Sequence, residues 1–122
     1  MPEQMHSAGL GKKGEERAAD ALEASGMRII AKNVRSRNGE VDIVALEGQT
    51  IVFVEVKSWS VFGMEDLQYS LDEKKQRRII ETAKYFLSGH REYSRMTIRF
   101  DVVFVGKDDS VSHLASAFTE NV

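Results

Sequence analysis

The chain has 122 residues, which is enough for one domain with a core of its own. It contains no cysteine, which excludes disulfides, thiolate metal sites and a cysteine nucleophile. The net charge of −2, from 17 Lys and Arg against 19 Asp and Glu, argues against a uniformly basic nucleic-acid coat protein but allows a local basic patch. No apolar run approaches the roughly 20 residues of a membrane span and no signal-peptide pattern is present, so we expect a cytoplasmic protein without a membrane partner.

The first third of the chain predicts a helix and a strand. We expect residues 1–6 to form a loose tail and apolar spacing to form a helix from about Ser7 to Ser25, closed by Gly26. The apolar run at 27–31 and the residues up to 35 predict a first strand, and "RSRNG" predicts a turn. Two further strands, at 40–46 and 50–57, flank the hairpin turn "EGQ".

The remainder predicts a helix followed by strands. Residues 58–69 show no period and predict a loop. Ser70 stands three residues before Glu73, the spacing of a capping box that would begin a helix ending at Gly89. "TIRFDVVFV" predicts a strand at 97–105, and after the turn "KDDS" a last short strand is expected at 111–118. The order of elements predicts a single α/β domain with a mixed sheet flanked by helices.

The two central strands carry charges where a buried strand normally carries only apolar residues. The stretch is "NGEVDIVALEGQTIVFVEVKSW", residues 38–59. If the hairpin is centred on the Gly-Gln pair of its turn and has no bulge, Asp42 faces Glu55 and Glu40 faces Lys57. Alternation along each strand then places all four side chains on one face, with the lysine beside two converging carboxylates.

Two carboxylates this close repel each other unless one is protonated or a cation lies between them. Oxygen ligands suit Mg²⁺ or Mn²⁺, and a neighbouring lysine could assist a water-derived nucleophile or offset charge on a phosphate. The alternative is a cross-strand ion pair between Glu40 and Lys57, with Asp42 and Glu55 on a solvated face. Two apolar residues precede Glu55 on its face, which favours a charged cleft at the end of a buried strand.

The hairpin resembles the PD-(D/E)XK nuclease motif, which has an acid on one strand and Glu-x-Lys on the next. Over roughly residues 9 to 105 the chain is also similar to the YraN-type family of small bacterial proteins. That similarity lies in the blocks "GKKGEERAADAL", "NVRSRNGEVDIV", "IVFVEVKSW", "KKQRRIIETAKYFL" and "IRFDVVFV". The family is similar to archaeal Holliday junction resolvases, and the resemblance implies a restriction-endonuclease-like fold. The chain departs from the motif at Val41, where the motif has proline.

The resemblance also implies roles for individual residues. Asp42, Glu55 and Lys57 match the catalytic set, and Asp42, Glu55 and Glu15 match the acids that hold Mg²⁺ or Mn²⁺. Periodicity independently places Glu15 on the apolar face of the first predicted helix, although it could instead stabilise the helix dipole. Glu40 matches a family acid that would be a second acid near the site or the partner of Lys57.

Other polar residues are weaker candidates. Gln76 matches a family position near the site, but an ordinary helix surface is equally compatible with it. Basic residues lie in the turn before the acids and on the second predicted helix, where they either bind phosphates or form a solvated face. The nucleic-acid-binding candidates are Arg35, Arg37, Lys74, Lys75 and Arg78.

Some charged residues are expected to have structural roles only. Asp101 is expected to pair with Arg99 or a backbone group. The histidines, which show no metal-ligand spacing, are expected at the surface: His6, His90 and His113.

Together these features predict a metal-dependent endonuclease that hydrolyses DNA phosphodiesters and selects branched or junction structures. A homodimer would suit paired cuts, and Trp59, Phe62 and Tyr69 in the 58–69 loop could form an interface or stack on bases. One alternative is a non-catalytic nucleic-acid-binding module that retains the nuclease fold. Another is a structural protein with a charged hairpin, because a fold alone does not settle function.

Overall fold

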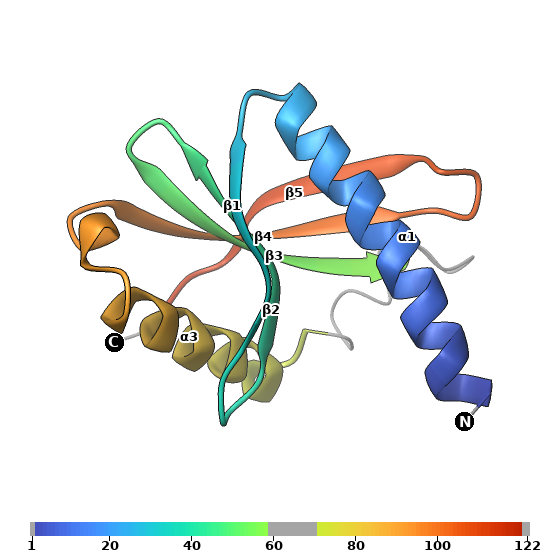
Figure 1. Ribbon diagram of the computed structural model, residues 1–122, viewed down its shortest axis with the longest axis horizontal. Coiled ribbons are helices and arrows are strands. Elements are labelled where there is room, and N and C mark those ends of the chain that lie inside the picture. Colours follow the sequence, from blue (N-terminus) through green and yellow to red (C-terminus); the bar gives the residue numbers. More distant parts are fainter. Residues whose placement is uncertain (1, 59–70, 121–122) are drawn as a thin grey trace.

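The computed structural model describes residues 2–58 and 71–120, with side chains from residue 12 onward. Its elements appear in Figure 1 and are, in chain order, α1 (Pro2–Ala24), β1 (Arg28–Arg35), β2 (Glu40–Glu47), β3 (Thr50–Ser58), α3 (Glu73–Ser88), the 3₁₀ helix η1 (Arg91–Tyr93), β4 (Thr97–Val105) and β5 (Val111–Phe118). They form a single small α/β domain, consistent with the predicted restriction-endonuclease-like fold. Within the described part of the chain, no helix has both the length and the apolar character needed to cross a membrane.

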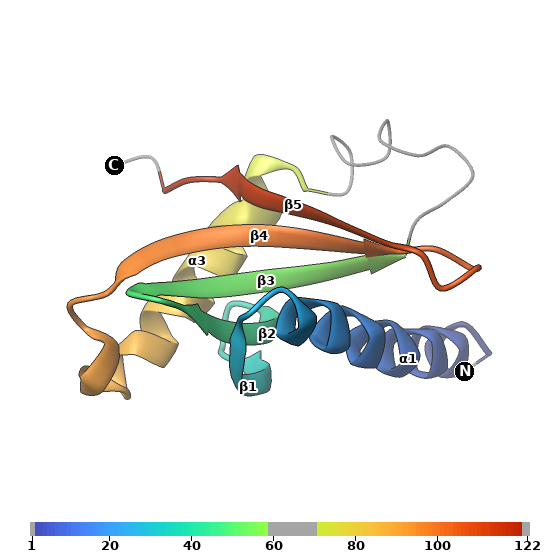
Figure 2. The ribbon, with the colours of Figure 1, turned by 90° about the horizontal axis from the view of Figure 1, so that it is seen from above.

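The sheet has five strands in the order β1-β2-β3-β4-β5. Neighbours are antiparallel except β3 and β4, which are parallel and lie side by side in Figure 2. Parallel strands cannot be joined by a tight turn, so the chain between them needs a crossover, and α3 lies in that connection. The end of β3 is therefore brought beside the end of β4 and near the start of α3.

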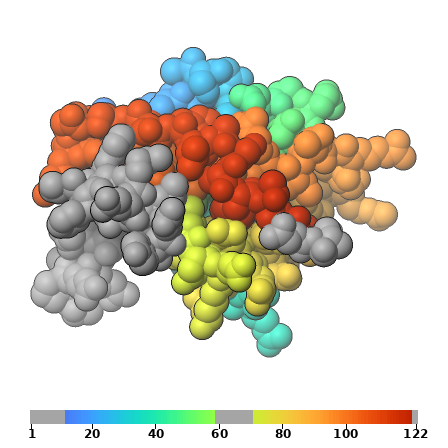
Figure 3. All heavy atoms as spheres, turned by 180° about the vertical axis from the view of Figure 1, so that it is seen from behind, coloured from blue at the N-terminus to red at the C-terminus, as the bar shows by residue number. Residues whose placement is uncertain are grey.

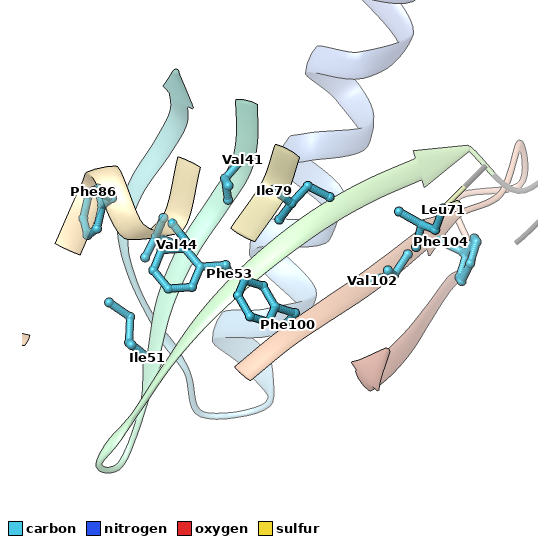
Figure 4. Packing of buried hydrophobic residues seen from close by; sticks show 11 residues of the cluster. Val41, Val44, Ile51, Phe53, Leu71, Ile79, Phe86, Phe100, Val102 and Phe104 are labelled. Atoms are coloured by element: carbon cyan, nitrogen blue, oxygen red, sulfur yellow. The ribbon is translucent and has the colours of Figure 1, made fainter. Parts of the chain in front are cut away.

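The helices cover opposite faces of the sheet (Figures 1 and 2). On one face α1 packs through Ala18, Ala19 and Leu22, and the small alanines allow the helix to approach the strands closely. On the other face α3 packs against an aromatic core, shown in Figure 4, in which the Phe53 and Phe100 ring centroids are 5.8 Å apart. Both faces of β2 and β3 are thus buried along most of their length, and their charged side chains lie toward the strand ends.

The turn between β1 and β2 lies against α3. A Cβ atom added at Gly39 would be 3.2 Å from Cβ of Arg78, so a side chain at this position would crowd the helix. The Ser36 and Thr82 hydroxyl oxygens are 2.8 Å apart, and Thr82 is fully buried. In Figure 3 this turn (turquoise) projects beside the start of α3 (yellow). The contact brings the basic residues of the turn next to those of the helix.

Two predicted helix starts differ from the structure. The first helix begins at Pro2, so the segment predicted to be a loose tail is helical from that residue. Proline suits the first turn of a helix, where its missing N–H would have no partner. In α3 the N-cap is Asp72, whose Oδ1 accepts the Lys75 backbone N–H at 2.9 Å, and not Ser70, which lies outside the described residues.

A buried carboxylate joins the last two strands. Asp101 is 0% exposed and accepts hydrogen bonds from Nε and Nη2 of Arg99, both at 2.9 Å, as predicted. It also contacts Nε2 of His113 at 2.7 Å and accepts the Ser116 backbone N–H at 3.0 Å. Although burial disfavours the charge, these donors, Arg99 foremost, hold the pKa of Asp101 below its usual value.

The histidine predictions hold in part. His113 is exposed on β5, as predicted, and its imidazole contacts Asp101. The His90 ring stacks on Phe86, with ring centroids 4.0 Å apart. Both imidazoles are structural partners of neighbouring groups, and the side chain of His6 lies outside the part that the structure describes.

We expect Asp101→Ala to lower the free energy of unfolding by about 3–5 kcal/mol, because it leaves the Arg99 guanidinium partly buried without its main partner. The matched control is Glu47→Ala, which removes the exposed carboxylate that Arg99 contacts at 2.7 Å. That change should cost less than about 1 kcal/mol. Urea unfolding measures both variants, and equal losses would contradict the assignment of Asp101 as the central group.

Candidate active site

The sheet divides at the predicted site. The hairpin register is as predicted, from Glu47 opposite Thr50 to Ile43 opposite Val54. Beyond Ile43, β2 remains paired with β1, ending with Glu40 opposite Arg35. The last residues of β3 instead follow β4, and the two strands separate in Figure 1. Asp42 is therefore the first β2 residue past the β2–β3 ladder, at a point we call the fork.

Two acids meet at the fork. Oδ2 of Asp42 accepts the Val56 backbone N–H at 2.8 Å, and its carboxyl group hydrogen-bonds that of Glu55. Burial, followed by the charge of Glu55, raises the pKa of Asp42 to about 8. The Glu55 side chain is 13% exposed. The alternative that places both acids on a solvated face is therefore wrong.

Lys57 contacts this acid pair. Its Nζ lies 3.2 Å from Oε2 of Glu55, and its side chain is 20% exposed. Glu40, the alternative partner, instead accepts a hydrogen bond from Nε of Arg35 at 3.0 Å. The physical reason is the fork, because β2 carries Glu40 away with β1 while Lys57 continues beside β4.

A second lysine reaches the site from α3. The side chain of Lys75 lies close to that of Lys57. This contact and burial lower the pKa of Lys75. For Lys57, burial acts to lower the pKa, but the contact with Lys75 and the charge of Glu55 outweigh it and the net pKa is raised. The pKa values of the two lysines thus shift in opposite directions, upward for Lys57 and downward for Lys75.

Glu15 approaches from α1, on the other side of the sheet. Burial and then the charge of Glu40 raise its pKa, and a hydrogen bond with the Asn33 side chain opposes that rise. Glu15 also contributes to the raised pKa of Asp42, so the two acids are close enough to influence each other. We expect Glu15 to be an outer member of the acid group rather than part of its central pair.

Asn33 is a site residue that the sequence analysis missed. Its φ of 53° is left-handed, which is uncommon for a residue other than glycine and is tolerated best by Asn and Asp. The residue lies within β1 and presents its amide to Glu15. An asparagine inside an otherwise apolar and basic strand was the available signal.

The remaining candidates do not contact the acid pair. The Gln76 amide donates to the Leu71 carbonyl oxygen at 2.8 Å, a local bond at the start of α3. The exposed basic side chains form a surface beside the fork, to which the β1–β2 turn and the first turns of α3 contribute. This basic surface comprises Arg35, Arg37, Lys74, Arg77 and Arg78. The predicted aromatic residues Trp59, Phe62 and Tyr69 lie outside the described residues.

The donor set at the fork suits a hard divalent cation. In residues 12–58 and 71–120, no three Asp, Glu or His side chains come close enough to form a ready metal site. Mg²⁺, however, usually takes only one or two protein carboxylates and completes its shell with water. Asp42 and Glu55 cannot both be ionised comfortably without a cation, and they supply this smaller set.

The following matches to known proteins all carry the name of one family. The model of the "Uncharacterised protein family UPF0102" matches residues 14–105. A UPF0102 protein of Treponema denticola is 42% identical, over 89% of this chain and 94% of its own. One from Treponema pallidum is 43% identical (96% and 98%), and one from Persephonella marina is 41% identical (88% and 91%). These matches confirm the resemblance to the YraN-type family.

We expect Asp42→Asn to stabilise the protein at alkaline pH in the presence of a chelator. The unfolded chain loses the Asp42 proton near pH 4, but the native state keeps it until about pH 8. The native state therefore binds one proton more across this window, so the wild-type free energy of unfolding falls as pH rises. Asparagine removes this loss, and the variant should be more stable at pH 8 by roughly 2–4 kcal/mol.

The measurement is urea unfolding from pH 5 to pH 8, with the exposed Asp20→Asn on α1 as the matched control. The difference between Asp42→Asn and wild type should grow with pH, whereas the control should run parallel to wild type. Parallel curves for all three proteins would show that Asp42 is ionised in the native state.

Proposed function

We propose that this chain, which belongs to the uncharacterised protein family UPF0102, is a nuclease that hydrolyses DNA phosphodiesters with the help of Mg²⁺ or Mn²⁺. The observation that carries the proposal is the group at the fork, where Asp42 and Glu55 share a hydrogen bond and Lys57 is paired with Glu55. A structural hairpin has no need for two acids in contact, because ionising both is costly unless a cation lies between them.

In this proposal Asp42 and Glu55 hold the cation, and Glu15 adds negative charge from α1. When bound, the cation would act as a Lewis acid toward the phosphate and make water a better nucleophile at neutral pH. The chain's own task is to hold both carboxyl groups aimed at one point, where a bound cation would favour their ionised forms. The Val56 N–H holds Asp42, and Lys57 holds Glu55, so neither acid needs to reorganise.

Lys57 is placed to act on the reacting phosphate. In hydrolysis the oxygen of water bonds to phosphorus, the ester bond from phosphorus to the leaving oxygen breaks, and one proton passes from water to the leaving oxygen overall. Negative charge grows on the phosphate oxygens during this change, and a fixed ammonium group beside them stabilises it. Lys57 keeps its proton in this environment, which suits it to electrostatic stabilisation better than to proton abstraction.

DNA is the proposed substrate because the basic surface borders the fork. Ammonium and guanidinium groups that contact phosphates bind without reading base sequence, so the protein would select the shape of DNA, such as a branch or junction. Paired cuts in a branched substrate need two copies of the site, and a homodimer is part of the proposal for that reason.

The rival proposal is a non-catalytic nucleic-acid-binding module with the same fold. It is favoured by the lack of any ready three-ligand metal group among the described residues. Its basic surface would bind DNA in the same way, but no metal-dependent cleavage would follow. The two experiments below separate these functions.

The first experiment tests the cation. Mg²⁺ or Mn²⁺ that binds only the native state should raise the unfolding midpoint of the wild type, adding about 2.7 kcal/mol at a concentration about 100 times the dissociation constant. Asp42→Ala should lose this gain, whereas Asp20→Ala, on the exposed side of α1, should keep it. Thermal unfolding at increasing metal concentration measures the effect. An unchanged wild-type midpoint would favour the binding module.

The second experiment tests the reaction. With Mg²⁺ or Mn²⁺, the wild type should cut labelled junction, flap or single-stranded DNA, and a gel assay follows the products. Lys57→Met should lower kcat by about 10²–10³ because it removes a charge that acts in the transition state. Lys107→Met, in the exposed turn after β4, should retain the wild-type rate. Full activity in Lys57→Met would remove that residue from the mechanism.

A further inference from the structure

The fork contains a second pair of like charges. Asp42 and Glu55 are two acids in contact, and Lys57 and Lys75 are two bases in contact. The two pairs are joined by the ion pair of Glu55 and Lys57 at 3.2 Å. A pair of carboxylates in contact is a place for a cation. By the same electrostatic argument, a pair of ammonium groups in contact is a place for an anion.

Lys75 differs from the other basic residues of α3. Its neighbour Lys74 is exposed, whereas Lys75 is half-buried and turned toward the sheet. Successive residues of a helix point about 100° apart, so only one of the two can face the fork. Among the described carboxylates, none forms an ion pair with Lys75, and its backbone N–H is already taken by Asp72. An ammonium group carries three hydrogens, so Lys75 can donate to an acceptor bound at the fork.

We propose that Lys57 and Lys75 together form a binding site for one phosphate group of the substrate, and that Lys75 is a substrate-positioning residue. The inference rests on the proposed nuclease function and adds to it the group that holds the phosphate from the α3 side. A phosphate suits the site because its several oxygens can accept from both ammonium groups at once. Asp42 and Glu55 would hold the cation, and the two lysines would supply further positive charge to the same phosphate.

An anion-binding site also explains why a half-buried lysine is tolerated here. Moving a lysine out of water without a carboxylate partner is unfavourable, and an adjacent lysine makes it more so. The Asp72 cap fixes the first turn of α3, and with it the direction of the Lys75 side chain. The helix thus holds the ammonium group at the fork before any phosphate arrives, so the protein need not reorganise when it binds.

The test is a titration with inorganic phosphate at pH 7 in the presence of a chelator, at constant ionic strength and followed by phosphorus NMR. The wild type should bind phosphate, and Lys75→Met should bind it about tenfold more weakly or worse. Lys75→Arg, which keeps the positive charge, should restore most of the binding. Lys84→Met removes the same charge from the exposed side of α3 and should bind like the wild type.

Two results would overturn the proposal: no phosphate binding by the wild type, or equal binding by wild type and Lys75→Met. Thermal unfolding of each variant shows that a loss of binding is not a loss of fold. A parallel arm measures DNA cleavage with Mg²⁺, where Lys75→Met should raise KM or lower kcat and Lys75→Arg should rescue it. If the wild type binds phosphate through both lysines but cuts no DNA, the nuclease proposal fails and the anion-binding site is retained.

Discussion

The site depends on one hydrogen bond, from the backbone N–H of Val56 to Oδ2 of Asp42. In an uninterrupted hairpin, a backbone carbonyl group of β2 would accept this N–H. Here β2 has left to follow β1, and a side-chain carboxylate takes that place. A buried amide must have a partner. The Val56 amide therefore keeps the ionisable Asp42 at the fork, although the preceding part of β3 is surrounded by apolar side chains.

The fork also explains how two helices on opposite faces can contribute to one site. Over most of its length the sheet separates α1 from α3, because the strands between them are buried on both sides. Where β2 and β3 separate, this barrier ends. Glu15 from one helix then influences Asp42, and Lys75 from the other contacts Lys57. Acid and base gather at the same opening, which Glu15 approaches from α1 and Lys75 from α3.

The parts of this arrangement that depend on short-range rules could be predicted from the sequence. The turn fixed the register of the hairpin, and with it the meeting of Asp42 and Glu55. The contact of Lys75 with Lys57 could not be predicted, because it depends on how the α3 crossover docks, and no local period contains that information. The start of α3 was misplaced because Ser70 and Asp72 both fit a capping rule, and only the structure selects Asp72. The sequence left open whether Glu40 pairs with Lys57, because extending the ladder on paper conceals the fork that places Glu40 beside Arg35.

The parallel pairing of β3 with β4 has a consequence for how the site is assembled during folding. The β1–β2–β3 meander joins segments that are close in sequence, whereas β4 and α3 must close a much longer loop before they add to it. We expect the acid pair to form with the meander and the lysine from α3 to arrive later. The growing chain therefore brings the two acids together with Lys57 alone, before the second positive charge, that of Lys75, reaches them. In that interval, protonation of a carboxyl group or a cation from the surroundings would relieve the repulsion, so the early steps of folding should be sensitive to pH and divalent metal.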